Sequence, residues 1–267
     1  MLACPVRDCH QALTREGQRW LCPRGHSFDI ARSGYINLLQ PQDRRSKHPG
    51  DTAAVVAARR RLHDRGVSGP LLRATAEMTA ASAGDVVLDA GCGDGFYLGS
   101  LALEAGFDAH GVDISTHAVD AAARRYPSCE GKFEWVVANA DRFIPYADRS
   151  FSVVLSVTAR MNAAEFRRVL RDDGRLVVGI PAPDDLIELR SRTGENGRDR
   201  VERTLETFGA RFTLIDRRRV TTAADLDAAA VQDILVSIYR PLRSQAVEAM
   251  RVTFSLDLLL FRARMKK

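Results

Sequence analysis

Cysteine is scarce in this sequence, with five among 267 residues. So few cysteines argue against a disulfide scaffold and favour metal binding or free thiols in a reducing compartment. No apolar run approaches the length needed to cross a bilayer. The first residues also lack the charged and apolar segments of a signal peptide. These absences predict a cytoplasmic protein with no membrane partner.

Acidic residues are few at the front of the chain. The first 65 residues contain twelve Lys and Arg but only six Asp and Glu, so they carry more positive charge than the whole protein, whose net charge is +5. Concentrated positive charge suits a polyanion such as nucleic acid. The alternative is an arginine-rich surface that is simply solvated.

Four of the scarce metal-binding residue types lie close together at the start. Cys4 and Cys9 form one pair, and Cys22 and His26 form another twelve residues later. Two such pairs provide the four ligands of a closed, structural zinc site, and the ion would supply the folding energy that so short a segment lacks. His10 competes for one ligand position. Unligated cysteines in a reduced chain are the alternative.

Strands alternate with helices from Asp85 onward, which is typical of a parallel sheet with helices on both faces. The sequence therefore predicts an α/β fold, a Rossmann-like, doubly wound and mostly parallel seven-stranded sheet with a small N-terminal zinc-binding module. We expect a module over 1–40, a linker with helices over 41–83 and the main domain over 84–267. A helix is expected over 162–174. Near the end, strands at 211–220 and 251–264 flank a helical stretch at 223–250, and the last strand is a candidate antiparallel addition.

The glycine-rich segment "LDAGCGDG" follows the first strand of this domain. A dinucleotide fingerprint would require a third glycine at residue 96, where the chain has Phe. The spacing is instead Gly91-x-Gly93-x-Gly95, and Asp113 ends the second strand. Glycines let a turn pass close beneath a ligand, and an acid at that strand end can accept hydrogen bonds from two ribose hydroxyls.

Together these features resemble the class I S-adenosylmethionine-dependent methyltransferases. In that family the glycine loop holds the amino-acid part of the cofactor, the acid after the second strand holds the ribose, and residues after the third strand flank the adenine. The resemblance implies these cofactor-binding residues: Asp89, Gly91, Gly93, Asp94, Gly95, Asp113, Ile114, Asn139, Ala140 and Asp141. Cys92 lies within the loop and is interpreted as a small packing residue.

Two further segments, "CPRGHSFDIARSGYINLL" and "KHPGDTAAVVAARRRLHDRG", resemble the zinc-bearing 23S ribosomal RNA guanine-N1 methyltransferases, a family that includes macrolide-resistance enzymes. The resemblance covers most of the chain. It implies that S-adenosylmethionine and structural zinc are the cofactors, and that the zinc module recognises an RNA hairpin while the C-terminal domain methylates one guanine. Guanine N1 lies on the Watson–Crick edge, so the base must be unpaired or flipped out. The candidates for RNA contact are Phe28, Tyr35, Arg44, Arg45 and Lys47, although Phe28 and Tyr35 could equally be packing residues.

The chain also departs from that family. The first two cysteines are separated by four residues instead of two. An aromatic-Ala-Pro turn is replaced by Thr158-Ala159-Arg160, and a tyrosine is replaced near Ser68. No catalytic residue is assigned: Asp185 is a candidate base, with an exposed loop acid as the alternative.

Two other functions remain open from the sequence, as does a homodimer. One is methylation of a small molecule with the N-terminal module reused as a lid, and the other is a non-catalytic RNA-binding protein. If the zinc module is independent, Cys22→Ser should release zinc while leaving cofactor affinity nearly unchanged.

Overall fold

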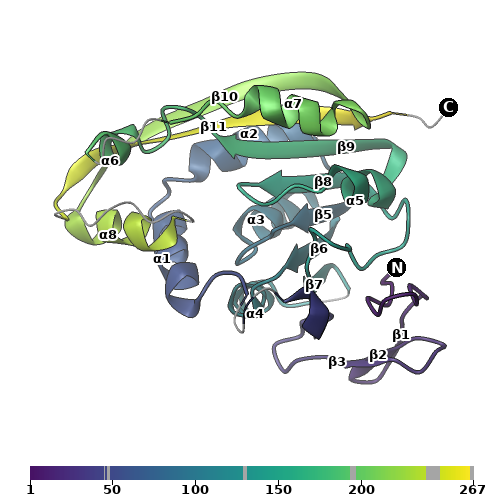
Figure 1. Cartoon of the computed structure of the whole chain (residues 1–267). Helices are drawn as coiled ribbons and strands as arrows, with labels where there is room; N and C mark the ends of the chain where they lie inside the picture. The colour runs from purple at the N-terminus through teal and green to yellow at the C-terminus, as the bar shows by residue number, and fades with distance from the viewer. Residues whose placement is uncertain (45, 47–48, 129–130, 193–196, 239–246, 265–267) are drawn as a thin grey trace.

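The computed structural model describes residues 1–267 except 45, 47–48, 129–130, 193–196, 239–246 and 265–267 (Figure 1). A large mixed sheet forms its centre, and its described strands have the order β10-β11-β9-β8-β5-β6-β7-β4. In chain order these strands are β4 (Ile36–Asn37), β5 (Val86–Ala90), β6 (Asp108–Asp113), β7 (Phe133–Val137), β8 (Phe151–Val157), β9 (Leu170–Pro181), β10 (Phe212–Leu226) and β11 (Met250–Ala263).

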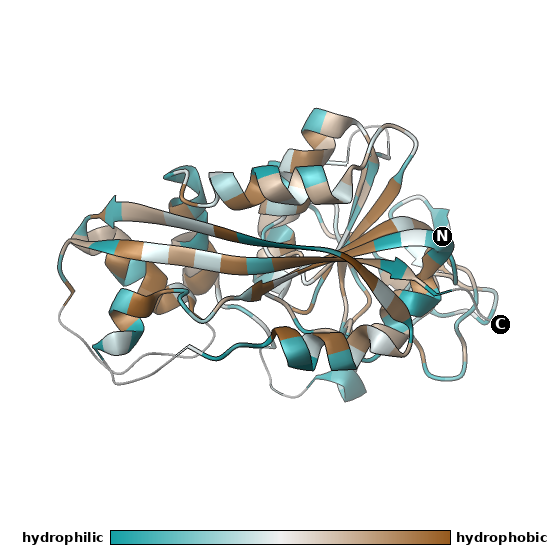
Figure 2. Cartoon of the chain, turned by 90° about the horizontal axis from the view of Figure 1, so that it is seen from above, coloured by the Kyte–Doolittle hydropathy of each residue, from teal (hydrophilic) through white to brown (hydrophobic). Residues whose placement is uncertain are grey.

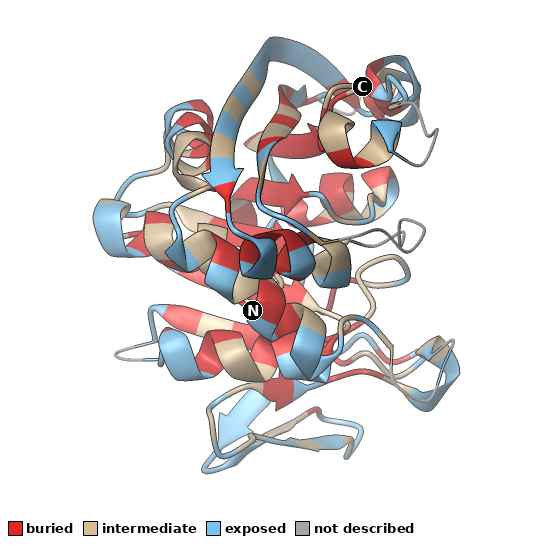
Figure 3. Cartoon of the chain, turned by 90° about the vertical axis from the view of Figure 1, so that its left-hand side faces the viewer, coloured by how far each residue is buried: buried red, intermediate tan, exposed pale blue. Residues whose placement is uncertain are grey.

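The sheet is mostly parallel, as expected. The strands from β4 to β9 pair in parallel, whereas β9, β11 and β10 pair antiparallel at the other end. Side chains from α2 (Gly69–Thr79), α3 (Phe96–Ala105) and α4 (Thr116–Arg125) join one buried cluster, and those of α5 (Ala163–Val169) and α7 (Val201–Gly209) join another. Figure 3 shows that buried positions concentrate in the central strands and the helices covering them. The Rossmann-like, doubly wound prediction is confirmed.

The hairpin of β10 and β11 extends beyond the rest of the sheet (Figure 2). Its far part packs with α1 (Ala53–Asp64), α6 (Ile187–Ser191) and α8 (Ala228–Ser237) around a third, smaller cluster of apolar side chains. This arrangement brings α1, which precedes the sheet in sequence, against α8 near the end of the chain. The hairpin therefore forms a wall beside the carboxyl ends of the central strands.

Two helices differ from the sequence expectation. The helix expected over 162–174 ends at Val169, and Leu170 begins β9 directly. Aspartate and glycine are weak helix formers, so the segment after Val169 gains more from pairing with the sheet. The helical stretch expected from Ala223 begins only after Asp227, whose side chain accepts a hydrogen bond from the backbone of Ala230. Pairing along the whole hairpin keeps the preceding residues extended.

The N-terminal residues form a separate antiparallel sheet of β1 (Thr14–Glu16), β2 (Arg19–Leu21) and β3 (Ser27–Asp29). They continue into β4, which pairs with β7 and so adds one strand to the seven that were expected. A short 3₁₀ turn, η1 (Pro41–Asp43), follows. In the described residues, every helix is too short or too polar to cross a membrane.

Candidate functional site

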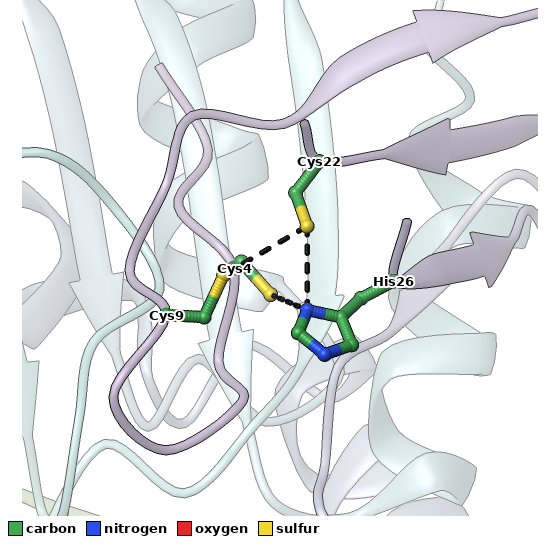
Figure 4. A group of neighbouring side chains, drawn as sticks. All are labelled: Cys4, Cys9, Cys22 and His26. Carbon is green, nitrogen blue, oxygen red and sulfur yellow. Dashed lines mark hydrogen bonds between the residues drawn. The ribbon is translucent and has the colours of Figure 1, made fainter. Parts of the chain in front are cut away.

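Four side chains from the loops beside the N-terminal sheet converge on one point (Figure 4). Cys4, Cys9, Cys22 and His26 each bring one ligand atom to a cluster whose members all lie within 4.8 Å of one another. Nδ1 of His26 is 3.4 Å from Sγ of Cys4 and 3.3 Å from Sγ of Cys22, and the sulfurs of Cys9 and Cys22 are 3.8 Å apart. Two sulfurs bound to one tetrahedral zinc at about 2.3 Å would be separated by about 3.8 Å. The spacing therefore fits a closed zinc site.

A tight turn of the backbone accommodates the four residues between Cys4 and Cys9. Asp8 within the gap and His10 just after Cys9 adopt positive φ angles of 62° and 48°, so the chain turns tightly on both sides of Cys9. Arg24 donates a hydrogen bond to the carbonyl of Asp8 at 2.7 Å and links the two halves of the cluster. His10, the competing ligand, instead packs on Phe143, with ring centroids 4.4 Å apart. The four residues named from the sequence are the ones brought together.

The zinc module is bonded to the main sheet at two places. The backbone of Leu38 donates to Val137 at the end of β7. The first residues of the chain also run beside the loop after β7, where Ala3 donates to Pro145 and Ala147 donates to Met1. The module is therefore bonded on both sides of residues 139–141, the segment in which adenine-flanking residues were predicted.

The candidates for RNA contact differ in exposure. Phe28 and Tyr35 are half-buried and pack against the two main apolar clusters, which favours the packing alternative for both. Arg44 is exposed at the end of η1. Arg45 and Lys47 lie outside the described residues.

The glycine loop connects β5 to α3, and its three glycines have φ angles of 93°, 55° and 75°. These values lie in the left-handed region, which side chains rarely adopt. At Gly91 a Cβ would lie 2.3 Å from Cβ of Ala159, and at Gly95 it would lie 2.6 Å from the Trp135 ring. The motif therefore reflects both a left-handed backbone and close packing against other side chains, while its predicted approach to a ligand stays a prediction.

Two carboxyl groups stand at the ends of neighbouring strands, and Asp89 is buried while Asp113 is half-buried. Asp113 accepts hydrogen bonds from the backbone of Gly93 at 3.0 Å and of Ser115 at 2.8 Å. Asp89 is buried, and its Oδ1 has no hydrogen-bond partner in the part of the chain that the structure describes. Burial, together with the charge of Asp113, raises the pKa of Asp89 to about 8. Burial also raises the pKa of Asp113. A buried carboxyl with one unpartnered oxygen beside a glycine cradle fits a cationic ligand.

The other predicted cofactor residues occupy different surroundings. Asp94 turns toward α1 and forms an ion pair with Arg60 at 2.6 Å. Ile114 is half-buried against the apolar cluster that includes α4. Sequence reasoning missed Arg59 on α1, which bonds Asp51 at 2.6 Å. Its Nη1 lies 3.8 Å from where a Cβ of Gly93 would be. The run of arginines in α1 was the sequence signal that could have identified Arg59.

The loop after β7 is joined to the loop after β8. Asn139 donates to the carbonyl of Asp43 at 3.0 Å, and its own oxygen accepts from the backbone of Asp141. The carboxylate of Asp141 pairs with Arg160 at 3.3 Å. Ala140 lies between them and is half-buried. Arg160 belongs to the turn that replaces aromatic-Ala-Pro. Its ion pair therefore fixes the loop 139–141, which was predicted to flank the adenine.

Asp185 is buried rather than exposed, so the loop-acid alternative is wrong. Its carboxylate accepts from the backbone of Ser255 at 3.0 Å and lies 3.7 Å from Arg190. Burial raises its pKa to about 6. These contacts give it a structural role that accounts for its position.

The comparisons with known proteins match the N-terminal zinc module and the main domain separately. Residues 2–47 match the family model "RlmA, N-terminal", a zinc ribbon, and residues 87–174 match the model "Methyltransferase domain". The 23S rRNA (guanine(748)-N(1))-methyltransferase of Streptomyces fradiae is 38% identical over 85% of this chain and 80% of its own length. A putative 23S rRNA (guanine-N(1)-)-methyltransferase of Micromonospora griseorubida is 38% identical over 72% and 70%.

The chain belongs to the 23S rRNA (guanine-N1) methyltransferase family. It is an S-adenosylmethionine-dependent methyltransferase with a structural zinc ribbon, as the resemblance implied. The fold is shared more widely: a putative methyltransferase from Bacillus halodurans C-125 has a TM-score of 0.51 at 15% identity, over 73% of this chain and 99% of that one.

The zinc cluster can be tested with Cys22→Ser. We expect bound zinc to fall from about one ion per chain to a small fraction, because a serine hydroxyl is a poor substitute for a thiolate ligand. Elemental analysis gives the measurement. His10→Ala is the matched control and should retain full zinc, and loss of zinc in that variant would contradict the ligand set.

The same Cys22→Ser variant tests the junction with the sheet. The bonds to Val137 and Pro145 revise the earlier expectation of independence, and we now expect weaker cofactor binding in calorimetry. Unchanged affinity in a zinc-free sample would show that the loop after β7 is held without the module.

The buried carboxyl of Asp89 should make stability depend on pH. The pKa of this group rises from 3.8 to about 8 on folding, so the unfolded chain ionises it while the folded chain does not, and its contribution to stability falls between these values. Asp89→Asn should have no advantage near pH 4 but raise the melting temperature by about 2–4 °C at pH 8. The exposed Asp173→Asn serves as control. Equal gains at both pH values would contradict the assignment.

Proposed function

We propose that this protein transfers a methyl group from S-adenosylmethionine to N1 of a guanine in a hairpin of 23S ribosomal RNA. The observation that carries the proposal is the glycine cradle beside the unpartnered Asp89, in a chain that begins with a zinc cluster. Two relatives that are 38% identical to the chain are named for this reaction.

The proposed cofactor site lies at the carboxyl ends of β5, β6 and β7. When bound, the cofactor supplies a methyl group already made electrophilic by its sulfonium. The loop of Gly91, Gly93 and Gly95 lies under its amino-acid part, where Arg59 places a positive charge suited to a carboxylate. Asp113 keeps lone pairs for the ribose hydroxyls, and the loop 139–141 flanks the adenine. With the reactants held in line, positioning supplies most of the acceleration.

The unpartnered oxygen of Asp89 has its natural partner in the ammonium group of that amino-acid part. Asp94 acts less directly, because its ion pair with Arg60 fixes the loop against α1. Ile114 contributes an apolar contact next to the ribose. These roles make the glycine loop, rather than any single side chain, the main determinant of cofactor position.

The proposed RNA-binding part is the basic N-terminal region. It comprises a zinc-built module over 1–40 and a linker with helices over 41–83, ahead of the methyltransferase domain over 84–267. Cys4, Cys9, Cys22 and His26 are the proposed zinc ligands. The exposed Arg44 begins a basic segment that continues with Arg45 and Lys47 in sequence, and such side chains suit RNA phosphates. Ribosomal RNA as substrate places the reaction in the cytoplasm.

The reaction itself is tested by incubating the protein with radiolabelled cofactor and unmodified 23S ribosomal RNA. A methyl group on guanine N1 blocks Watson–Crick pairing, so the modified position is mapped as a stop in reverse transcription. We expect one stop at a hairpin guanine. Label found only in a metabolite extract would show that a small molecule is the substrate, and cofactor binding without any transfer would point to a non-catalytic protein.

RNA binding should weaken steeply with salt, because phosphate contacts release counterions. Removing one such contact with Arg44→Ala should reduce the slope of log affinity against log salt by about 0.7–0.9. Filter binding at several salt concentrations gives the measurement. Arg171→Ala, at an exposed arginine of β9, is the control and should leave the slope unchanged. An unchanged slope for Arg44→Ala would remove this residue from the interface.

A further inference from the structure

Helix α1 contacts two parts of the molecule that are far apart in the sequence. One is the glycine loop, where Arg60 bonds the carboxylate of Asp94 at 2.6 Å. The other is the hairpin lobe, which comprises β10, β11 and α8, and Figure 1 shows α1 beside α8. With about 3.6 residues per turn, neighbouring residues of a helix face different directions. The rotation of α1 against α8 therefore decides which of its side chains face the glycine loop.

An ion pair with two contacts joins α1 to α8. Nε of Arg61 donates to one oxygen of Asp233 at 2.9 Å, and Nη2 donates to the other oxygen at 2.6 Å. Asp233 is buried, with 7% of its surface exposed, whereas Arg61 is exposed. A bidentate pair of this kind fixes orientation as well as distance.

Apolar packing supplements this pair. Leu62, the residue after Arg61, is buried in the third apolar cluster together with Val231 and Ile234 of α8. Hydrophobic burial is non-directional, so it holds the two helices together without fixing their rotation. The ion pair of Arg61 with Asp233 therefore supplies the direction that the packing lacks.

Arg59 depends on this rotation. Its Nη2 donates to the carbonyl of Ser237, the last residue of α8, at 3.2 Å, and its Nη1 donates to the carboxylate of Asp51 at 2.6 Å. The same Nη1 lies 3.8 Å from where a Cβ of Gly93 would be. A guanidinium that is held from two sides is oriented before a ligand binds, which lowers the cost of binding.

The support from Asp51 is itself fixed locally. Its carbonyl accepts a hydrogen bond from the hydroxyl of Ser115, at the start of α4, at 2.6 Å. Just before it, a Cβ at Gly50 would lie 2.7 Å from Cβ of Ser115, so the chain approaches α4 closely. The segment before α1 is thus held against the strand end that carries Asp113. The second support of Arg59 comes from α8, much later in the chain.

We propose that Asp233 is a positioning residue for cofactor binding, which acts through Arg61 to set the rotation of α1 and so directs Arg59 toward the carboxylate of the cofactor's amino-acid part. The inference rests on the proposed function, because it concerns the same cofactor site. It adds the hairpin lobe to the parts of the chain on which cofactor affinity depends.

Asp233→Asn keeps the size of the side chain and removes its charge. Calorimetry should show a three- to tenfold loss of affinity for S-adenosylhomocysteine, about the range for a residue that acts through an intervening element. Affinity for the decarboxylated form of this ligand should change by less than about twofold, because it offers Arg59 no carboxylate. Asp225→Asn is the matched control. It removes an exposed carboxylate of the same lobe, paired with Arg251, and should leave both affinities unchanged.

A double-mutant cycle tests the route of the effect. Arg61→Gln should cause the same selective loss as Asp233→Asn, since each variant removes the same contact. The double variant should then lose no more affinity for S-adenosylhomocysteine than either single variant. Additive losses would show that Asp233 acts by another route and would overturn the proposal.

The outcomes separate this proposal from the proposed function. Equal losses for both ligands in Asp233→Asn would indicate a general role in the stability of the lobe and overturn the positioning role, as would unchanged affinities. If the unmutated protein binds neither ligand, the proposed function and this inference fail together. Should Asp233→Asn not fold, Arg61→Gln changes an exposed side chain and carries the same test, with the same supporting and overturning results.

Discussion

The hydrogen bonds from the backbone of Gly93 and Ser115 to the carboxylate of Asp113 organise the centre of this protein. They join the loop after β5 to the start of the helix after β6, so two neighbouring strand ends act as one surface. The cost is that this half-buried carboxylate lies close to the buried carboxyl of Asp89, whose Oδ1 has no hydrogen-bond partner among the described residues. A cationic cofactor would relieve that cost, which explains why the arrangement is useful despite being unfavourable in its absence.

The zinc ribbon is more than an attached domain. Through β4 and the first residues of the chain it is bonded to β7 and to the loop that follows it. The ion therefore stabilises a short segment that has little core of its own, and that segment in turn supports one wall of the proposed cofactor site. The zinc ribbon and the main sheet are consequently joined by ordinary backbone hydrogen bonds. The pair of Arg160 with Asp141 closes the same wall from the other side.

Much of the site could be predicted because its signals are local. The spacing of the four zinc-binding side chains and the glycines after an apolar strand each depend on a few neighbouring residues, and the structure brings the zinc ligands together as expected. The helix predicted to reach Gly174 shows where local sequence signals fail. Its last residues gain more from pairing with the sheet than from helical bonds, and no local pattern reports that competition.

The sequence by itself determined the alternation of strands and helices, the metal-binding spacing and the turn that requires glycine, because these follow from propensity and backbone conformation over short distances. Only the tertiary structure decided that Arg59 lies beside the loop and that Asp185 is buried and bonded to the backbone of Ser255. These contacts join residues up to 70 positions apart in the sequence. Such contacts depend on how the hairpin of β10 and β11 folds back over the sheet, which is a property of packing and not of any segment.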